Sequence, residues 1–164
     1  MRRLIAVAAA CLALAACATP TVYQAAATPG AVGFTETRIE PGRYRVTFQG
    51  GSGAPAAQVE DYALLRAAEI TLRDGYDWFT ISDRSGEILP PRSSSSVSIG
   101  TGGGDLGRHG GVGVGVGTTF DLSGGPMLRR SLEIVMGKGA KPPGPDSYDA
   151  RGVEDEIGPR AGRR

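Results

Sequence analysis

The sequence predicts a small α+β domain in which a mostly antiparallel sheet carries one helix packed on one face. Three segments support this prediction. Residues 43–48 and 127–136 show the two-residue alternation of half-buried strands, and residues 55–74 show the wide apolar stripe of a packed helix. A helix of this kind must bury its apolar stripe against another element, and here the sheet is the available partner.

Arg43–Phe48 is the clearest predicted strand. Its apolar residues Tyr44, Val46 and Phe48 alternate with polar ones, which gives one apolar face and one hydrated face. Pro41-Gly42, just before it, is typical of a turn. We therefore expect a strand that is buried on one side.

The segment 55–74 is the strongest predicted helix. Pro55 suits the first helical turn, and Gly75 suits the left-handed position just past the last turn. Several alanines lie on the broad apolar face, so we expect the helix to lie close to the sheet.

Two further strands are expected at Tyr76–Ser82 and Met127–Met136. They are separated by a flexible Gly/Ser-rich insertion at about residues 84–111, which cannot bury enough surface to order itself. The Val-Gly alternation at 112–116 either shares this behaviour or pairs as an extra strand. The resulting order is β-α-β, a long insertion, then β.

The N-terminus has the three parts of a secretory signal peptide. Arg2 and Arg3 supply positive charge, Leu4–Leu14 is almost wholly apolar, and two alanines follow. The apolar run is shorter than the roughly 20 residues that a spanning helix requires. We therefore exclude residues 1–16 from the fold.

The end of this segment resembles a bacterial lipobox, because Leu14-Ala15-Ala16 precedes Cys17. In proteins with this motif the cysteine thiol receives a diacylglycerol, the chain is cut before the cysteine, and the new amine receives a fatty acid such as palmitate. Each buried methylene contributes about 0.8 kcal/mol, so several acyl chains anchor stably. Cys11 lies inside the apolar run and is expected to leave with it. The alternative is plain secretion after cleavage behind Ala16 or Ala18.

Two low-complexity segments flank the predicted domain, which covers residues 33–136. Residues 17–32 are predicted to be the lipidated cysteine and a tether. Residues 137–164 are rich in proline and glycine and are predicted to be an exposed, disordered tail. A short acidic helical turn at Tyr148–Ile157 is the exception that we expect within this tail.

Composition excludes several classes of function. The whole chain has a formal net charge of +1, and a nucleic-acid-binding protein would need clustered positive charge. Both cysteines are accounted for by the signal peptide and the anchor, so the mature chain has no thiol for catalysis or for a thiolate metal site. We expect no cofactor and no metal.

Several short strings resemble an uncharacterised lipoprotein family of alphaproteobacteria. They are Glu36–Pro41, Arg43–Phe48, Leu65–Glu69, Gly75–Phe79, Met136-Gly137 and Tyr148–Arg151. The resemblance spans about residues 33–83 and 127–152 and omits the insertion. It implies a lipid anchor, but the family has no assigned activity, so it supplies no catalytic residues.

The candidates for catalysis lack the partners that chemistry requires. His109 has no nearby histidine or cysteine and no positioned nucleophile, so we interpret it as a solvated loop residue. Gly113–Gly117 lacks both the following helix and the Lys-Ser/Thr ending of a phosphate loop. The carboxylates do not form a pair across a recognisable cleft; they are Glu36, Glu40, Glu60, Asp61, Glu69, Asp74 and Asp77.

Arg38, Arg43 and Arg45 are the weak candidates for ligand contacts. As one basic face they would bind anionic lipid or cell-wall polymer. The favoured alternative is pairing with acids on neighbouring strands, since charges are common on sheet surfaces.

The sequence therefore predicts a lipoprotein of the cell envelope that acts as a non-catalytic interaction or structural module. Its partners would be the membrane, through the lipid on Cys17, and an envelope protein or a cell-wall polymer. A binding module for an envelope ligand is the alternative, and a hydrolase is a distant one. Ala18 is not an acidic retention residue, so we expect the periplasmic face of the outer membrane.

Overall fold

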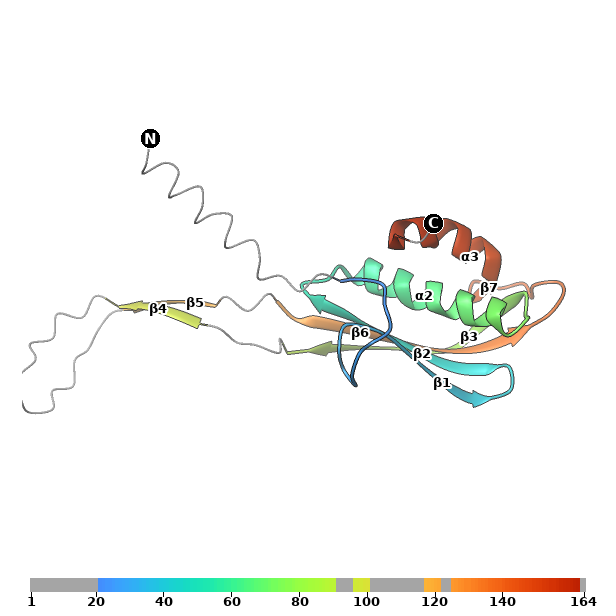
Figure 1. Cartoon of the computed structure of the whole chain (residues 1–164), viewed down its shortest axis with the longest axis horizontal. Coiled ribbons are helices and arrows are strands. Elements are labelled where there is room, and N and C mark those ends of the chain that lie inside the picture. Colours follow the sequence, from blue (N-terminus) through green and yellow to red (C-terminus); the bar gives the residue numbers. More distant parts are fainter. Residues whose placement is uncertain (1–20, 91–95, 101–116, 122–124, 163–164) are drawn as a thin grey trace, which may run out of the picture.

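The computed structural model describes residues 21–90, 96–100, 117–121 and 125–162. Within these ranges five strands form one antiparallel sheet in the order β1-β2-β6-β3-β7 (Figure 1). The strands are β1 (Gly33–Glu40), β2 (Arg43–Ser52), β3 (Trp78–Leu89), β6 (Met127–Gly137) and β7 (Ser147–Asp149). Two α-helices accompany the sheet, α2 (Ala56–Arg73) and α3 (Ala150–Ile157). The predicted α+β class and the antiparallel sheet are confirmed.

Helix α2 packs against β2 and β6 through buried side chains. The alternating residues Val46 and Phe48 of β2 are fully buried on this side, as expected from the sequence. Ala63 and Ala67 of α2 are also fully buried, and their small side chains let the helix lie close to the strands. Burying one large apolar side chain contributes about 1.5–3 kcal/mol, so this face accounts for much of the stability.

Strand β3 is longer than the sequence predicted. It continues past Ser82 to Leu89, with an irregularity in pairing between Ile81 and Asp83. The local sequence after Ser82 is typical of a turn, but β6 offers backbone partners along its whole length, and this pairing overrides the local preference. The insertion therefore begins after Leu89 and not at residue 84.

The C-terminal segment also differs from the prediction of a disordered tail. Residues 147–161 form β7, α3 and a short 3-10 helix, η2 (Gly158–Ala161). Helix α3 packs on α2 through buried Ala150 and Ile157 (Figure 1). Its first turn is capped by Asp149, whose side chain accepts a hydrogen bond from the backbone N–H of Gly152 at 2.7 Å. A few buried residues and one cap order this segment despite its composition.

The predicted tether is folded onto the domain from Thr21 onward. The ring of Tyr23 lies 5.2 Å from that of Phe34 and 5.4 Å from that of Tyr62. Its hydroxyl donates a hydrogen bond to Glu69 at 2.6 Å. The backbone of residues 24–26 also pairs with Phe34 at the outer edge of β1. We call residues 21–32 the N-terminal strap.

The described part of the insertion is a second, two-stranded sheet. In it, β4 (Ser96–Gly100) pairs antiparallel with β5 (Gly117–Asp121). Several predictions lie outside the described residues; they concern the signal peptide at 1–16, Cys17, His109, the Val-Gly alternation at 112–116 and the glycine-rich segment Gly113–Gly117 except for its last residue, which begins β5. Among the described helices, none is both long enough and apolar enough to cross a membrane.

Candidate functional site

The structure does not bring the three candidate arginines together. Arg43 and Arg45 lie on β2 and point to the side of the sheet opposite α2, which we call the open face. Arg38 is opposite Tyr44 in the pairing of β1 with β2, and Tyr44 is buried on the helix side. Side chains of directly paired residues share a face, so Arg38 lies on the helix side. The predicted basic face is therefore divided between two sides of the sheet.

The two arginines on the open face are paired with acids. Both reach Glu133 of the neighbouring strand β6, and Arg43 does so at 3.1 Å. Arg43 also contacts Glu40 at 3.5 Å. Hydrogen bonds from Arg45 and Arg43 hold the pKa of Glu133 below its ordinary value. The alternative of cross-strand pairing therefore describes Arg43 and Arg45 better than a free basic surface does.

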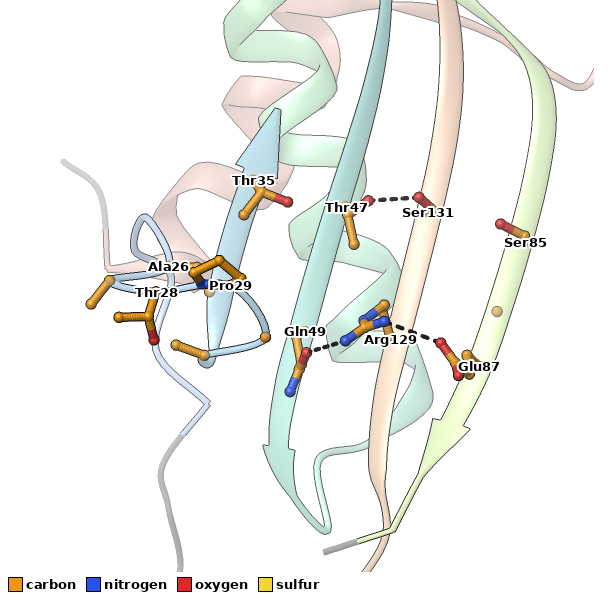
Figure 2. A pocket seen from close by; sticks show the side chains of 15 residues that line it. Ala26, Thr28, Pro29, Thr35, Thr47, Gln49, Ser85, Glu87, Arg129 and Ser131 are labelled. Atoms are coloured by element: carbon orange, nitrogen blue, oxygen red, sulfur yellow. Dashed lines mark hydrogen bonds and ion pairs between the residues drawn. The ribbon is translucent and has the colours of Figure 1, made fainter. Parts of the chain in front are cut away.

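A groove of about 790 Å³ lies on the open face, between the strap and the sheet (Figure 2). Residues 26–31 of the strap form one wall. The floor and the other wall come from alternating residues of β2, β6 and β3. The polar side chains that line the sheet side are Thr35, Thr47, Gln49, Ser85, Glu87, Arg129 and Ser131.

Strand register assembles a polar row at the groove floor. Gln49 of β2 is opposite Arg129 of β6, which in turn is opposite Glu87 of β3. Arg129 donates to the Gln49 carbonyl oxygen at 3.0 Å and contacts the Glu87 carboxylate at 3.2 Å (Figure 2). Gln49 is only 3% exposed, so its amide is held in one orientation.

A second row consists of hydroxyl groups. The hydroxyl oxygens of Thr47 and Ser131 are 2.6 Å apart and share a hydrogen bond (Figure 2). Thr35 and Ser85 extend this row to both sides, because they are the register partners of Thr47 and Ser131. The groove thus offers amide, hydroxyl and backbone groups together with one ion pair whose charges balance.

This arrangement suits binding better than bond cleavage. Glu87 is the one carboxylate among the groove-lining residues, and it forms an ion pair with Arg129. A two-carboxylate hydrolase would need a second acid across the cleft. The hydroxyls of Thr47 and Ser131 bond to each other, with no base beside them in the described lining.

Two of the candidate carboxylates belong to an ion-pair network on the helix side. Glu36 of β1 contacts Arg66 at 2.6 Å and Arg73 at 2.7 Å. Burial raises the pKa of Glu36, but hydrogen bonds from Arg73 and Arg66 outweigh it, and the net pKa lies below the ordinary value. Burial likewise raises the pKa of Asp74, and hydrogen bonds from Tyr44 and Arg73 bring it below the ordinary value. These acids stabilise the contact of α2 with β1 and β2.

The remaining candidate carboxylates have structural contacts as well. They are Glu40 with Arg43, Glu60 with Arg84 and Arg130, Asp61 with Arg160, Glu69 with Arg66, and Asp77 with the backbone N–H of Gly139. In the part of the chain that the structure describes, no three of the His, Cys, Asp and Glu residues gather in a way that would hold a metal ion.

Comparison with known proteins found no match among protein-family models, curated proteins or solved structures.

The groove residues were not predicted from the sequence. A signal was nevertheless present, since Thr47, Arg129 and Ser131 are the positions that alternate with the apolar residues of β2 and β6. What the sequence does not show is which of these positions lie opposite each other, because residues 47 and 131 pair across 84 residues of chain.

Proposed function

We propose that this chain is a lipoprotein of the bacterial cell envelope, anchored through Cys17, and that its folded domain is a non-catalytic interaction module. The interaction module is supported by the groove on the open face. Its polar side chains hold one another in place through hydrogen bonds, and its one ion pair is balanced in charge. The anchor rests on the lipobox before Cys17.

Membrane association and partner capture test this proposal together. Intact envelopes are crosslinked, and the native protein is purified beside a Cys17→Ser variant. Mass spectrometry then identifies the acyl chains on Cys17 and the crosslinked species. The expected result is an acylated Cys17 and a partner captured by the lipidated form alone. An unacylated Cys17 contradicts the anchor, and an acylated protein without any partner contradicts the interaction module.

The groove favours a second, more specific function, the binding of an uncharged polyhydroxyl ligand such as the glycan of the cell wall. Sugar hydroxyls both donate and accept hydrogen bonds, and the Thr35-Thr47-Ser131-Ser85 row offers the same capacity. The balanced pair of Arg129 and Glu87 neither attracts nor repels such a ligand. In this hypothesis the arginines of β2 are not the contact residues, because they already bind Glu133.

Two matched substitutions test the ligand-binding function. Thr35→Trp places a ring in the groove, whereas Thr37→Trp places the same ring two residues further along β1, on the same face but outside the groove lining. Aromatic residues are well tolerated in strands, so both variants should fold. We expect Thr35→Trp to lose co-sedimentation with isolated cell-wall sacculi and Thr37→Trp to keep it. Equal behaviour of the two variants would exclude the groove as the binding site.

A further inference from the structure

One end of the five-stranded sheet, apart from the insertion that leaves it after Pro90 and returns at Gly125, is formed by described segments without a charged residue. It consists of residues 21–33, 50–57, 88–90 and 125–128, which we call the neutral end. Antiparallel pairing brings these segments together. The start of β1, the end of β2, the end of β3 and the start of β6 lie side by side at one end of the strands. No Asp, Glu, Lys or Arg occurs in these four segments, although 21% of the whole chain is charged.

The opposite end is densely charged. This end is formed by the β1-β2 turn, the end of α2, the start of β3 and the end of β6. The backbone N–H of Met136 in β6 donates a hydrogen bond to the carbonyl of Gly42 in the turn. The charged residues of this end are Arg38, Glu40, Arg43, Arg73, Asp74, Asp77, Lys138 and Lys141. The two ends are separated by the length of a strand; the ten residues of β2 span roughly 30 Å.

The described chain begins at the neutral end. The Thr21 hydroxyl accepts a hydrogen bond from the backbone N–H of Gly51 at 3.0 Å, and Gly53 donates to the Pro126 carbonyl at 3.1 Å. Cys17 precedes Thr21 by four residues, which reach at most roughly 14 Å when fully extended. This reach is less than half of the length of β2. A lipid on Cys17 would therefore hold the neutral end close to the membrane surface.

The surface chemistry of the neutral end suits the headgroup layer. Two of its apolar side chains are well exposed, Ile88 at 72% and Val22 at 47%. A charged group pressed against a bilayer loses hydration at a cost in free energy. The neutral end avoids this cost, whereas the charged end would meet it.

We infer that the neutral end is the surface that faces the phospholipid bilayer, so that the charged end points away from it. The inference rests on the proposed lipid anchor and adds an orientation to it. The groove shares residues 26–31 with the neutral end, so its ligand would be bound close to the headgroups.

Two cysteine variants of the full lipidated protein test the orientation. Ala57→Cys lies in the first turns of α2 at the neutral end, and Ala140→Cys lies beside Lys138 at the charged end; both alanines are exposed. Each thiol receives a fluorophore, and the protein is placed in vesicles of phosphatidylethanolamine and phosphatidylglycerol with a nitroxide on a fraction of the headgroups. We expect several-fold stronger quenching at position 57 than at position 140. Pro126→Cys is a second neutral-end variant if Ala57→Cys does not fold.

Flotation separates failure of the anchor from failure of the orientation. A protein that does not float with the vesicles, or whose unsubstituted form reacts with the fluorophore at Cys17, contradicts the proposed anchor. A protein that floats but shows equal quenching at the two positions, or stronger quenching at position 140, overturns the orientation alone.

Discussion

The two faces of the central sheet are formed by the same strands but are stabilised in different ways. On the helix side Val46, Phe48 and Leu132 are fully buried against α2 and its neighbours. On the open face Thr47 bonds to Ser131, and Arg129 contacts Gln49 and Glu87; these residues line the solvent-open groove. Since an exposed polar pair stabilises far less than a buried apolar side chain, the open face can vary at little cost to folding. It is therefore the face on which a binding function can be placed.

The largest expected effect compares neighbouring residues of β2. Phe48→Ala removes a fully buried ring and should lower the free energy of unfolding by about 3–5 kcal/mol. Thr47→Ala removes a hydroxyl from the open face and should cost about 1 kcal/mol. Urea denaturation monitored by circular dichroism gives both values. Similar costs for the two variants would contradict the division of roles between the faces.

A second pair of substitutions tests whether close packing on the open face requires glycine at position 137. A Cβ at Gly137 would lie 2.1 Å from the ring of Trp78, its direct partner on β3. Gly137→Ala should therefore cost about 1–3 kcal/mol. Gly158→Ala is the control, because its Cβ would meet nothing within 4 Å and its φ of −51° is helical. The control should be neutral or stabilising by about 0.4–1 kcal/mol. Loss of stability in both variants would mean that backbone freedom, and not the Trp78 ring, requires glycine.

These comparisons also show which features local sequence can predict. Strand β2 and helix α2 were predicted because their apolar residues repeat with the period of the element and face one large buried surface. Strand β1 was missed because it is an edge strand in which residues 35–40 contain one apolar residue, Ile39. Helix α3 was foreseen only as a short turn, because two buried residues are too few to reveal its packing face.

The groove and the neutral end could not be predicted because they depend on register. Gln49 and Arg129 meet through the pairing of β2 with β6, which are far apart in the chain. The prediction for Arg38, Arg43 and Arg45 assumed that nearby arginines share a face, whereas the turn after β1 places Arg38 opposite Tyr44. The prediction of a tether was wrong from Thr21 onward. Composition does not show that the ring of Tyr23 packs against the rings of Phe34 and Tyr62.

A smaller effect on the free energy of unfolding is expected in acid, from Glu36 and Asp74 on the helix side. The pKa values of Glu36 and Asp74 lie below their ordinary values of 4.5 and 3.8 in the folded state. Their contribution to stability is therefore complete above those ordinary values and is lost as the pH falls through the lower folded values. Glu36→Gln should be less stable than the parent at neutral pH and should lose less stability on acidification. Denaturation curves from neutral pH to about pH 3 measure this.

The exposed Asp155→Asn on α3 is the control for the acid experiment. It should follow the parent curve. A Glu36→Gln variant that loses as much stability in acid as the parent would show that the network around Arg66 and Arg73 does not depend on the Glu36 charge.

The smallest effect is expected for the paired arginines of the open face. Arg45→Ala breaks an ion pair with Glu133 in which Arg45 is 54% exposed, so the cost should be about 0–1 kcal/mol. The difference should shrink further in high salt. A loss well above this range would mean that the open face contributes to folding as strongly as the helix side does.

The mass of the native mature chain tests the proposed lipid anchor on Cys17. The protein is purified from the envelope fraction of its own cell, and its N-terminal peptide is sequenced by mass spectrometry. We expect a chain that begins at Cys17 and carries a diacylglyceryl group together with an acyl chain on the new amine. A chain that begins elsewhere, or an unmodified Cys17, would contradict both the anchor and the orientation that depends on it.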